Sequence, residues 1–138
     1  MTDTERTLVL LKPDAVERHL IGQIISRYEA KGLVVRAMEL RTIDAEIAST
    51  HYAEHVGRDY YPPLEEFITS GPLVALVLEG RKAIQVIRAM HGKTDCAEAA
   101  PGTIRGDYGT LNNRNLVHAS DSPESAQREI GIWFPDLV

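Results

Sequence analysis

The chain has 138 residues, of which 43% are hydrophobic and 25% charged, as is typical of one soluble globular domain spanning residues 1–138. Its 20 acidic and 15 basic side chains give a formal charge of −5, which argues against nucleic acid or an anionic membrane as a partner. The single cysteine, Cys96, excludes an intrachain disulfide and a cysteine-rich metal site and fits a reducing, cytoplasmic location.

The first residues, Met1 to Arg6, are polar and acidic and do not form the basic and apolar segments of a signal peptide. No stretch reaches the ~20 apolar residues that a membrane-spanning helix requires. We therefore expect neither secretion nor membrane insertion.

The first half of the chain alternates strand and helix patterns. Residues 7–11 form a continuous apolar run that predicts a buried strand, and residues 33–41 predict a more mixed one. Pro13 fits the first turn of a helix, and apolar residues at helical spacing extend the pattern to Tyr28. Asp44 can cap a further helix that runs through Tyr52 and His55.

In the second half, residues 60–70 predict a helix, 73–78 a buried strand and 83–90 an amphipathic helix. A long stretch of weak periodicity follows to Leu116, and loops of that length in compact domains are usually functional or disordered. A last helix starts at Ser122. Taken alone, the alternation of strands and helices favours a parallel α/β sheet.

Common glycine-rich phosphate loops are absent, but residues 51–55 match H-x-x-E-H, the inverted zinc-protease pattern. On one helix, His51 and His55 would share a face and bind zinc, with Glu54 as general base. The pattern is short, and we find no third ligand. An amphipathic helix with two ordinary histidines explains it equally simply.

His118 follows the short apolar run Leu116-Val117 and precedes the start of the last helix. A nearby helix N-terminus disfavours the imidazolium and favours an incoming phosphate, which suits a nucleophilic histidine. Such a ring needs an acceptor for its second nitrogen, and Glu129, about two turns into the helix, is a candidate. The alternatives are a core histidine and a solvated glutamate.

Phosphoryl transfer also requires cations that neutralise the phosphate oxygens. Lys12, Arg88 and Arg105 are candidates from three separate segments. Their spacing does not bring them together, and each alone reads as a surface charge.

Four segments resemble motifs of the nucleoside diphosphate kinases, in the order and spacing of that family. They are ERTLVLLKP at residues 5–13, GTIRGDY at 102–108, NLVHASD at 115–121 and SPESAQRE at 122–129. Residues 51–67 and 92–95 fit as well, so the resemblance covers nearly the whole chain.

The resemblance implies a ferredoxin-like α/β (α+β) sandwich, with a four-stranded antiparallel sheet and an inserted helical pair at about residues 44–70. This replaces the parallel sheet. It implies a homo-oligomer, with a hexamer preferred and a tetramer possible.

It also implies a ping-pong reaction. A nucleoside triphosphate, mainly ATP, gives its γ-phosphoryl group to the δ nitrogen of His118, and a nucleoside diphosphate then takes it. Glu129 would orient the ring and Ser120 would steady Glu129. Lys12 and Tyr52 would lie near the transferred group.

The remaining implied contacts concern the nucleotide. Lys12 and Asn115 would bind the ribose 3′-hydroxyl, and the base would stack on Tyr60, with little selectivity because every base has an aromatic face. The phosphates would be held by Arg88, Thr94 and Arg105, with His55 near the α-phosphate. Mg²⁺ would arrive on the β- and γ-phosphates, with Asp121 reaching it through water at most and no metal site on the protein.

Four residues depart from the family pattern. Ala119 replaces a common glycine and demands ordinary backbone there, and Tyr60 replaces phenylalanine, with its hydroxyl expected to point outward. Asn112 replaces an apolar residue of the base clamp, and Cys96 replaces a proline of the long loop. A catalytically silent nucleotide-binding module on the same fold is the alternative function, but such relatives commonly lose the histidine, which this chain keeps.

Overall fold

The structure, a computed structural model, describes residues 3–111 and 114–137. It contains a four-stranded sheet with the order β2-β3-β1-β4, in which every pair is antiparallel. The strands are β1 (Thr4–Leu11), β2 (Val34–Arg41), β3 (Leu73–Arg81) and β4 (Val117–Ala119). The expected antiparallel sandwich is confirmed, and the parallel sheet that alternation favoured is wrong.

The helices follow the expected positions with three differences in extent. They are α1 (Pro13–Glu17), α2 (Ile21–Ala30), α3 (Ala45–His51), α4 (Tyr61–Ile68), α5 (Ala83–His91), α6 (Ile104–Tyr108), α7 (Pro123–Trp133) and a 3₁₀ turn, η1 (Pro135–Leu137). None of the described helices has the length and apolar character needed to cross a bilayer.

The differences have local causes. The helix expected from Pro13 to Tyr28 is two helices, because His19 adopts a left-handed conformation between them. The helix capped by Asp44 ends at His51 and does not include His55. The weakly periodic stretch contains α6, whose first turn is capped by the Thr103 side chain.

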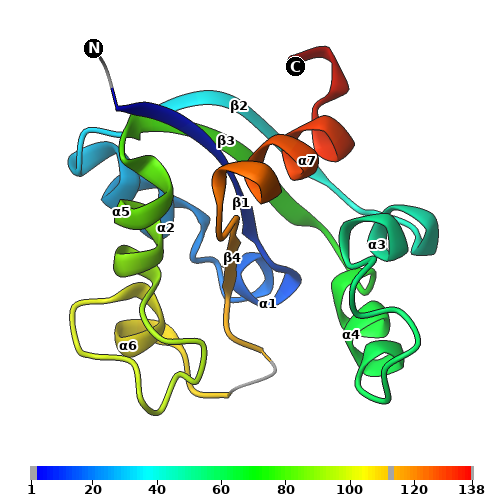
Figure 1. Cartoon of the computed structure of the whole chain (residues 1–138). Helices are drawn as coiled ribbons and strands as arrows, with labels where there is room; N and C mark the ends of the chain where they lie inside the picture. Colours follow the sequence, from blue (N-terminus) through cyan, green and yellow to red (C-terminus); the bar gives the residue numbers. More distant parts are fainter. Residues whose placement is uncertain (1–2, 112–113, 138) are drawn as a thin grey trace.

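Helices cover both faces of the sheet (Figure 1), and this explains the continuous apolar runs. Along β1, Val9 and Leu11 pack with α2 and α5, whereas Leu8 and Leu10 pack with α3, α4 and α7. Continuous apolar strands are typical of parallel sheets, but they require only that both faces be buried. The inserted pair α3–α4 lies on one side of β4 and α5–α6 on the other.

Candidate active site

A cavity of about 370 Å³ lies beside β4 and is lined by residues from α3, α5, α6, β4, α7 and the loops between them. It brings together most of the side chains that the sequence nominates. These are Lys12, Tyr52, His55, Arg88, Thr94, Arg105, Asn115, His118, Asp121 and Glu129. The cations that spacing left apart therefore share one site.

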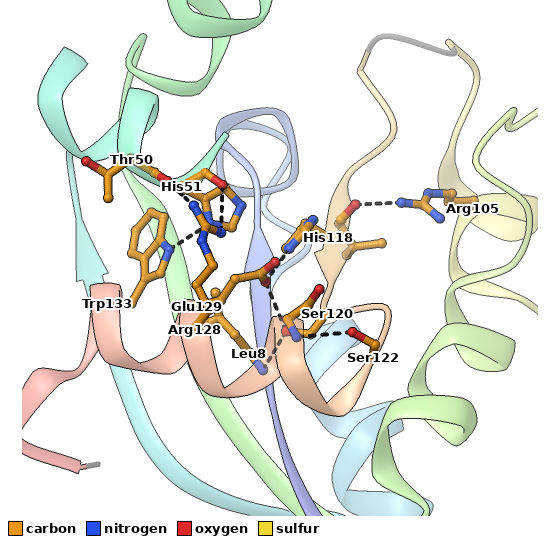
Figure 2. Close-up of polar contacts among 12 residues, drawn as sticks. Leu8, Thr50, His51, Arg105, His118, Ser120, Ser122, Arg128, Glu129 and Trp133 are labelled. Atoms are coloured by element: carbon orange, nitrogen blue, oxygen red, sulfur yellow. Dashed lines mark hydrogen bonds and ion pairs between the residues drawn. The ribbon is translucent and has the colours of Figure 1, made fainter. Parts of the chain in front are cut away.

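His118 lies on β4 opposite Leu10 of the central strand β1. Its Nε2 lies 2.9 Å from a carboxylate oxygen of Glu129, and the Ser120 hydroxyl donates to the same oxygen at 2.9 Å (Figure 2). A carboxylate only accepts, so Nε2 carries the hydrogen and Nδ1 of the neutral ring keeps its lone pair. No residue within 3–111 and 114–137 forms a hydrogen bond with that Nδ1.

The start of α7 fixes where Glu129 projects. The Ser122 hydroxyl accepts a hydrogen bond from the Ser125 amide at 3.1 Å, and Pro123 occupies the first turn, where its missing N–H costs nothing. Glu129 itself is buried. The sequence motif that follows the histidine therefore builds the helix that holds it.

Lys12 lies directly after β1 and is buried in the cavity, where its ammonium group donates to Asn115 Oδ1 at 2.8 Å. The pKa of Lys12 is lowered to about 8, mainly by burial and also by the nearby Arg105 charge, and Asp14 opposes both effects. A lysine in this state binds anions readily but loses its proton in the mildly alkaline range.

Arg105, on α6, donates to three backbone carbonyls: Asn115 through Nε, Gly92 through Nη1 and Val117 through Nη2, at 3.1, 3.0 and 2.7 Å. It holds the segment that enters β4. Leu116 within it has a left-handed backbone (φ 74°), which is costly for a non-glycine residue.

The backbone of Leu116 is held on its other side by β1 and α1. Its N–H donates to an Asp14 carboxylate oxygen at 3.0 Å, and its carbonyl accepts from the Lys12 amide at 2.8 Å. The turn before His118 is therefore fixed by the side chains of Asp14 and Arg105 and by the backbone amide of Lys12.

Comparisons with known proteins show the family to which the chain belongs. The sequence model of the nucleoside diphosphate kinase family matches residues 5–137. The chain belongs to the nucleoside diphosphate kinase family. It is 78% identical to the nucleoside diphosphate kinase of Cutibacterium acnes over 138 residues, which is 100% of both chains. It is 61% identical to that of Mycobacterium tuberculosis over 133 residues, covering 96% of this chain and 98% of the relative.

Solved structures of the family have the same fold. A Halobacterium salinarum nucleoside diphosphate kinase, solved in complex with CDP, has a TM-score of 0.92 at 48% identity and covers 94% of this chain and 87% of its own. That of Aquifex aeolicus has a TM-score of 0.94 at 44% identity and covers 97% of both chains. As a member of this family, the chain is a phosphotransferase that acts on nucleotides.

In this nucleoside diphosphate kinase, aromatic side chains lie at the mouth of the cavity. Tyr52 lines it, and burial raises the pKa of its hydroxyl, which therefore stays protonated. Tyr60 is not among the lining residues; it is 53% exposed at the edge, beside His55. Its hydroxyl oxygen lies 2.6 Å from His55 Nδ1 in an exposed hydrogen bond, and the outward orientation of this hydroxyl stays a prediction.

Two expected phosphate contacts lie at the other side of the mouth. Arg88 and Thr94 line the cavity and are exposed there. The Asn115 amide donates to the Thr94 carbonyl at 3.3 Å, which ties this loop to the deeper residues. Ser120 lies behind the cavity, fully buried, and reaches it only through Glu129.

The zinc geometry proposed for H-x-x-E-H is wrong in this enzyme, because α3 ends at His51 and the two histidines do not share a helical face. His51 instead accepts a hydrogen bond from Trp133, and His55 pairs with Tyr60. The ligand atoms of His51, His118 and Glu129 do lie within 4.8 Å of one another. In this set Nδ1 of His51 is occupied by the indole N–H, so its Nε2 carries hydrogen and is not available to a metal.

The sequence reasoning missed two residues of the site and considered a third, His51, only as a zinc ligand. Asp14 holds Leu116, Arg128 donates to the His51 carbonyl, and His51 itself lies against His118. Asp14 could have been found, because a buried charge next to a candidate lysine requires a partner. The other two depend on the contact between α3 and α7, which no spacing in the sequence reveals.

Two departures from the family pattern are visible in the structure. Ala119 lies in β4 opposite Val9 with ordinary extended backbone, as expected. Cys96 is buried and its thiol donates to the Leu111 carbonyl at 3.3 Å. Asn112 lies outside the described residues, so its effect on the base clamp stays a prediction.

Proposed function

We propose that the chain transfers the γ-phosphoryl group of a nucleoside triphosphate, mainly ATP, to a nucleoside diphosphate through a phosphohistidine at His118. The observation that carries this proposal is the hydrogen-bonded chain Ser120–Glu129–His118, which leaves Nδ1 with a lone pair inside a cavity that also contains Lys12 and Arg105. A nucleophile with a base that orients it is the usual arrangement for covalent catalysis. The chain acts as one domain, residues 1–138.

In the first half-reaction, Nδ1 forms a bond to the γ-phosphorus while the bond to the β–γ bridging oxygen breaks, and the diphosphate leaves with that electron pair. The ring becomes positive as the bond forms, and the Glu129 carboxylate stabilises this charge through the Nε2 hydrogen. In the second half-reaction, a terminal oxygen of another diphosphate attacks the phosphorus and the lone pair returns to Nδ1.

The other lining residues bind and orient the nucleotide. Lys12 and the Tyr52 hydroxyl lie near the transferred group, and Asn115 shares the ribose 3′-hydroxyl with Lys12, to which it is already hydrogen-bonded. Arg88, Thr94 and Arg105 hold the leaving phosphates, although Arg105 has only two of its five N–H groups beyond the three bound to carbonyls. Tyr60 supports the base from the edge of the cavity.

Mg²⁺ fits this site as a companion of the nucleotide. Asp121 lines the cavity near Arg88, and a hydrogen bond with Ser125 is the main cause that lowers the pKa of its carboxyl group. Ionised carboxylate oxygens and water suit Mg²⁺, so Asp121 would hold it through water. When bound, the ion supplies neutralisation of the β- and γ-phosphate charge.

We also propose that the enzyme is a homo-oligomer, with a hexamer preferred over a tetramer. β2 is an edge strand, and Met38 and Leu40 on it are 59% and 61% exposed. Exposed apolar side chains on an unpaired edge are a typical self-association surface. A cytoplasmic location stays a prediction.

The deciding experiment mixes the protein with Mg²⁺ and γ-labelled ATP and leaves out any acceptor. The expected result is acid-labile, base-stable label on His118 that is discharged by added GDP. His118→Asn should take no label while still folding and binding ADP. Absence of label on folded wild-type protein that binds ADP would reject the proposal in favour of a silent nucleotide-binding module.

A further inference from the structure

His51 is a buried histidine at the end of α3 to which the proposed function gives no role. The indole N–H of Trp133 donates to its Nδ1 at 3.0 Å. An indole nitrogen is only a donor, so Nδ1 is the acceptor. A neutral His51 ring therefore carries its hydrogen on Nε2.

His51 contacts the imidazole of His118 directly. The two ring centroids are 4.7 Å apart, and the ring planes are nearly perpendicular at 78°. The hydrogen bond to Glu129 sets the direction of the His118 Nε2–H bond but permits rotation of the ring about that direction. A ring packed against it restricts this remaining freedom.

One helix holds both histidines (Figure 2). Glu129 and Trp133 are four residues apart on α7 and so lie on one face, where the first binds His118 and the second binds His51. Arg128 adds backbone contacts, donating to the carbonyls of Thr50 and His51. The relative position of the two rings is therefore set by α7.

We propose that His51, held by Trp133 in the Nε2–H form, is a positioning residue that fixes the ring plane of His118 for phosphoryl transfer. The proposal rests on the proposed role of His118 as the nucleophile. The Trp133 bond and the Glu129 bond act together: each fixes one ring, and the contact between the rings completes the alignment.

The surroundings of His51 keep it neutral. Burial is the main cause that holds the pKa of His51 well below its ordinary value, and the nearby His118, Arg128, Lys12 and His55 act in the same direction. His51, His118 and Glu129 form a cluster in which Glu129 is the only anion. Its carboxylate already binds His118 and Ser120. A neutral ring also preserves the acceptor that Trp133 requires.

The first test needs no activity. Long-range ¹H–¹⁵N spectra of ¹⁵N-histidine-labelled, unliganded protein at pH 7 report the protonation of each ring nitrogen, and His51→Asn assigns the His51 signals. We expect an unprotonated Nδ1 and a protonated Nε2. An Nδ1–H form or an imidazolium would overturn the proposal, whether or not wild-type protein accepts label from ATP.

The second test uses two variants. Trp133→Phe removes the N–H but keeps an aromatic ring, and His51→Asn keeps an acceptor near the position of Nδ1 but removes the ring. Misplacing a reacting group by ~1 Å can cost on the order of 10²-fold, so we expect each variant to slow single-turnover labelling of His118 by about 10- to 100-fold. The ADP dissociation constant should stay unchanged.

The double variant should be no slower than the slower single variant, because both changes release the same ring. The control is His19→Asn, at an exposed left-handed position outside the cavity lining, and this variant should label at the wild-type rate. Wild-type labelling rates in both variants, or a matching loss of ADP affinity, would overturn the proposal.

Discussion

At the scale of single residues, the hydrogen bond between His118 and Glu129 is the contact on which the proposed reaction depends most directly. Glu129→Gln keeps the shape but replaces an acceptor-only carboxylate with a neutral amide that can also donate. The ring then loses both its enforced tautomer and the charge that stabilises it. We expect labelling of His118 to slow by roughly 10²-fold or more, measured in single turnover.

The matched control is Glu124→Gln, an exposed glutamate in the first turn of the same helix. It makes the same chemical change away from the ring and should leave the labelling rate within about twofold. Equal rates for Glu129→Gln and Glu124→Gln would show that Glu129 has no role in the transfer.

Lys12 gives the enzyme a pH dependence of its own. Because the pKa of Lys12 is about 8, the free enzyme loses this charge as pH rises through that value. We expect kcat/KM to fall on the alkaline side of about pH 8, since kcat/KM reports the free enzyme. Lys31→Gln, an exposed change, should leave the profile in place, whereas Lys12→Arg should remove this limb while lowering activity.

The same group affects stability with a defined sign. Between about pH 8 and its ordinary value of 10.5, the unfolded chain keeps a proton that the folded chain has lost. The contribution of Lys12 to the free energy of unfolding therefore rises with pH across this window. Urea unfolding of wild-type and Lys12→Met protein at pH 7.5 and 10 measures it, and a gap that does not change with pH would contradict it.

At this scale the sequence indicated which residues belong to the site, but it did not indicate which residues they contact. His118 and Glu129 were nominated from the end of a strand and the start of the next helix, and the resemblance to the family motifs gave them their roles. Asp14 was not nominated and His51 was considered only as a zinc ligand, because each matters through a contact with a residue about 100 or 70 positions away. Such pairings exist only after the sheet has formed.

At the scale of elements, the start of α7 supports Glu129, which binds the proposed nucleophile His118. Ser122→Ala removes the acceptor of the Ser125 amide, and loss of such a cap costs about 1 kcal/mol of the free energy of unfolding. Ser122→Asp restores an acceptor and should recover most of that loss. Denaturant unfolding measures both, and equal stability of the two variants would remove the cap from the account.

The segment entering β4 depends on the planar fork of Arg105. Arg105→Lys cannot bind three carbonyls at once, so we expect a loss of about 2 kcal/mol in unfolding free energy together with slower labelling of His118. Arg18→Lys gives the comparison, because Arg18 donates to a single carbonyl, that of Tyr108. A loss no greater than that of Arg18→Lys would contradict the role of Arg105.

Helices and strands could be predicted where their apolar pattern is long, and the prediction failed where the pattern is short. The helices α5 and α7 and the strand β3 follow from their apolar spacing. The helix α6 did not, because five residues are too few to show a period and its start depends on the Thr103 side chain. The end of α3 at His51 was missed for a related reason, since no Gly or Pro interrupts the sequence before Gly57.

At the scale of the whole molecule, the exposed edge strand β2 is the surface through which we expect copies of the chain to associate. Replacing both Met38 and Leu40 with Glu puts like charges on the exposed edge and should shift the enzyme to smaller species in sedimentation experiments. Val56→Glu, a half-exposed apolar residue outside the sheet, is the control and should not change the assembly. An unchanged assembly in the double variant would place the subunit contact elsewhere.

Strand order is the part of the architecture that local pattern could not supply. β1 and β3 are apolar on both faces because helices cover both, and that pattern is the same for parallel and antiparallel neighbours. The resemblance of the motifs to a known family supplied the antiparallel arrangement, and the structure gives the order β2-β3-β1-β4. The contacts that determine where β4 lies are in the loops and helix caps around it, and the apolar pattern of the strands does not reveal them.

The turn at Leu116 connects catalysis to the completion of folding. Its left-handed backbone is held by Asp14 and Lys12 near the beginning of the chain and by Arg105 late in it. The ring of His118 is held by Glu129 of α7, the last α-helix. On the proposed mechanism, a nascent chain that has not yet released α7 from the ribosome lacks the carboxylate that orients the His118 ring. Recovery of phosphoryl transfer should consequently be the last signal to return during refolding, after the sheet and helices have regained their circular dichroism.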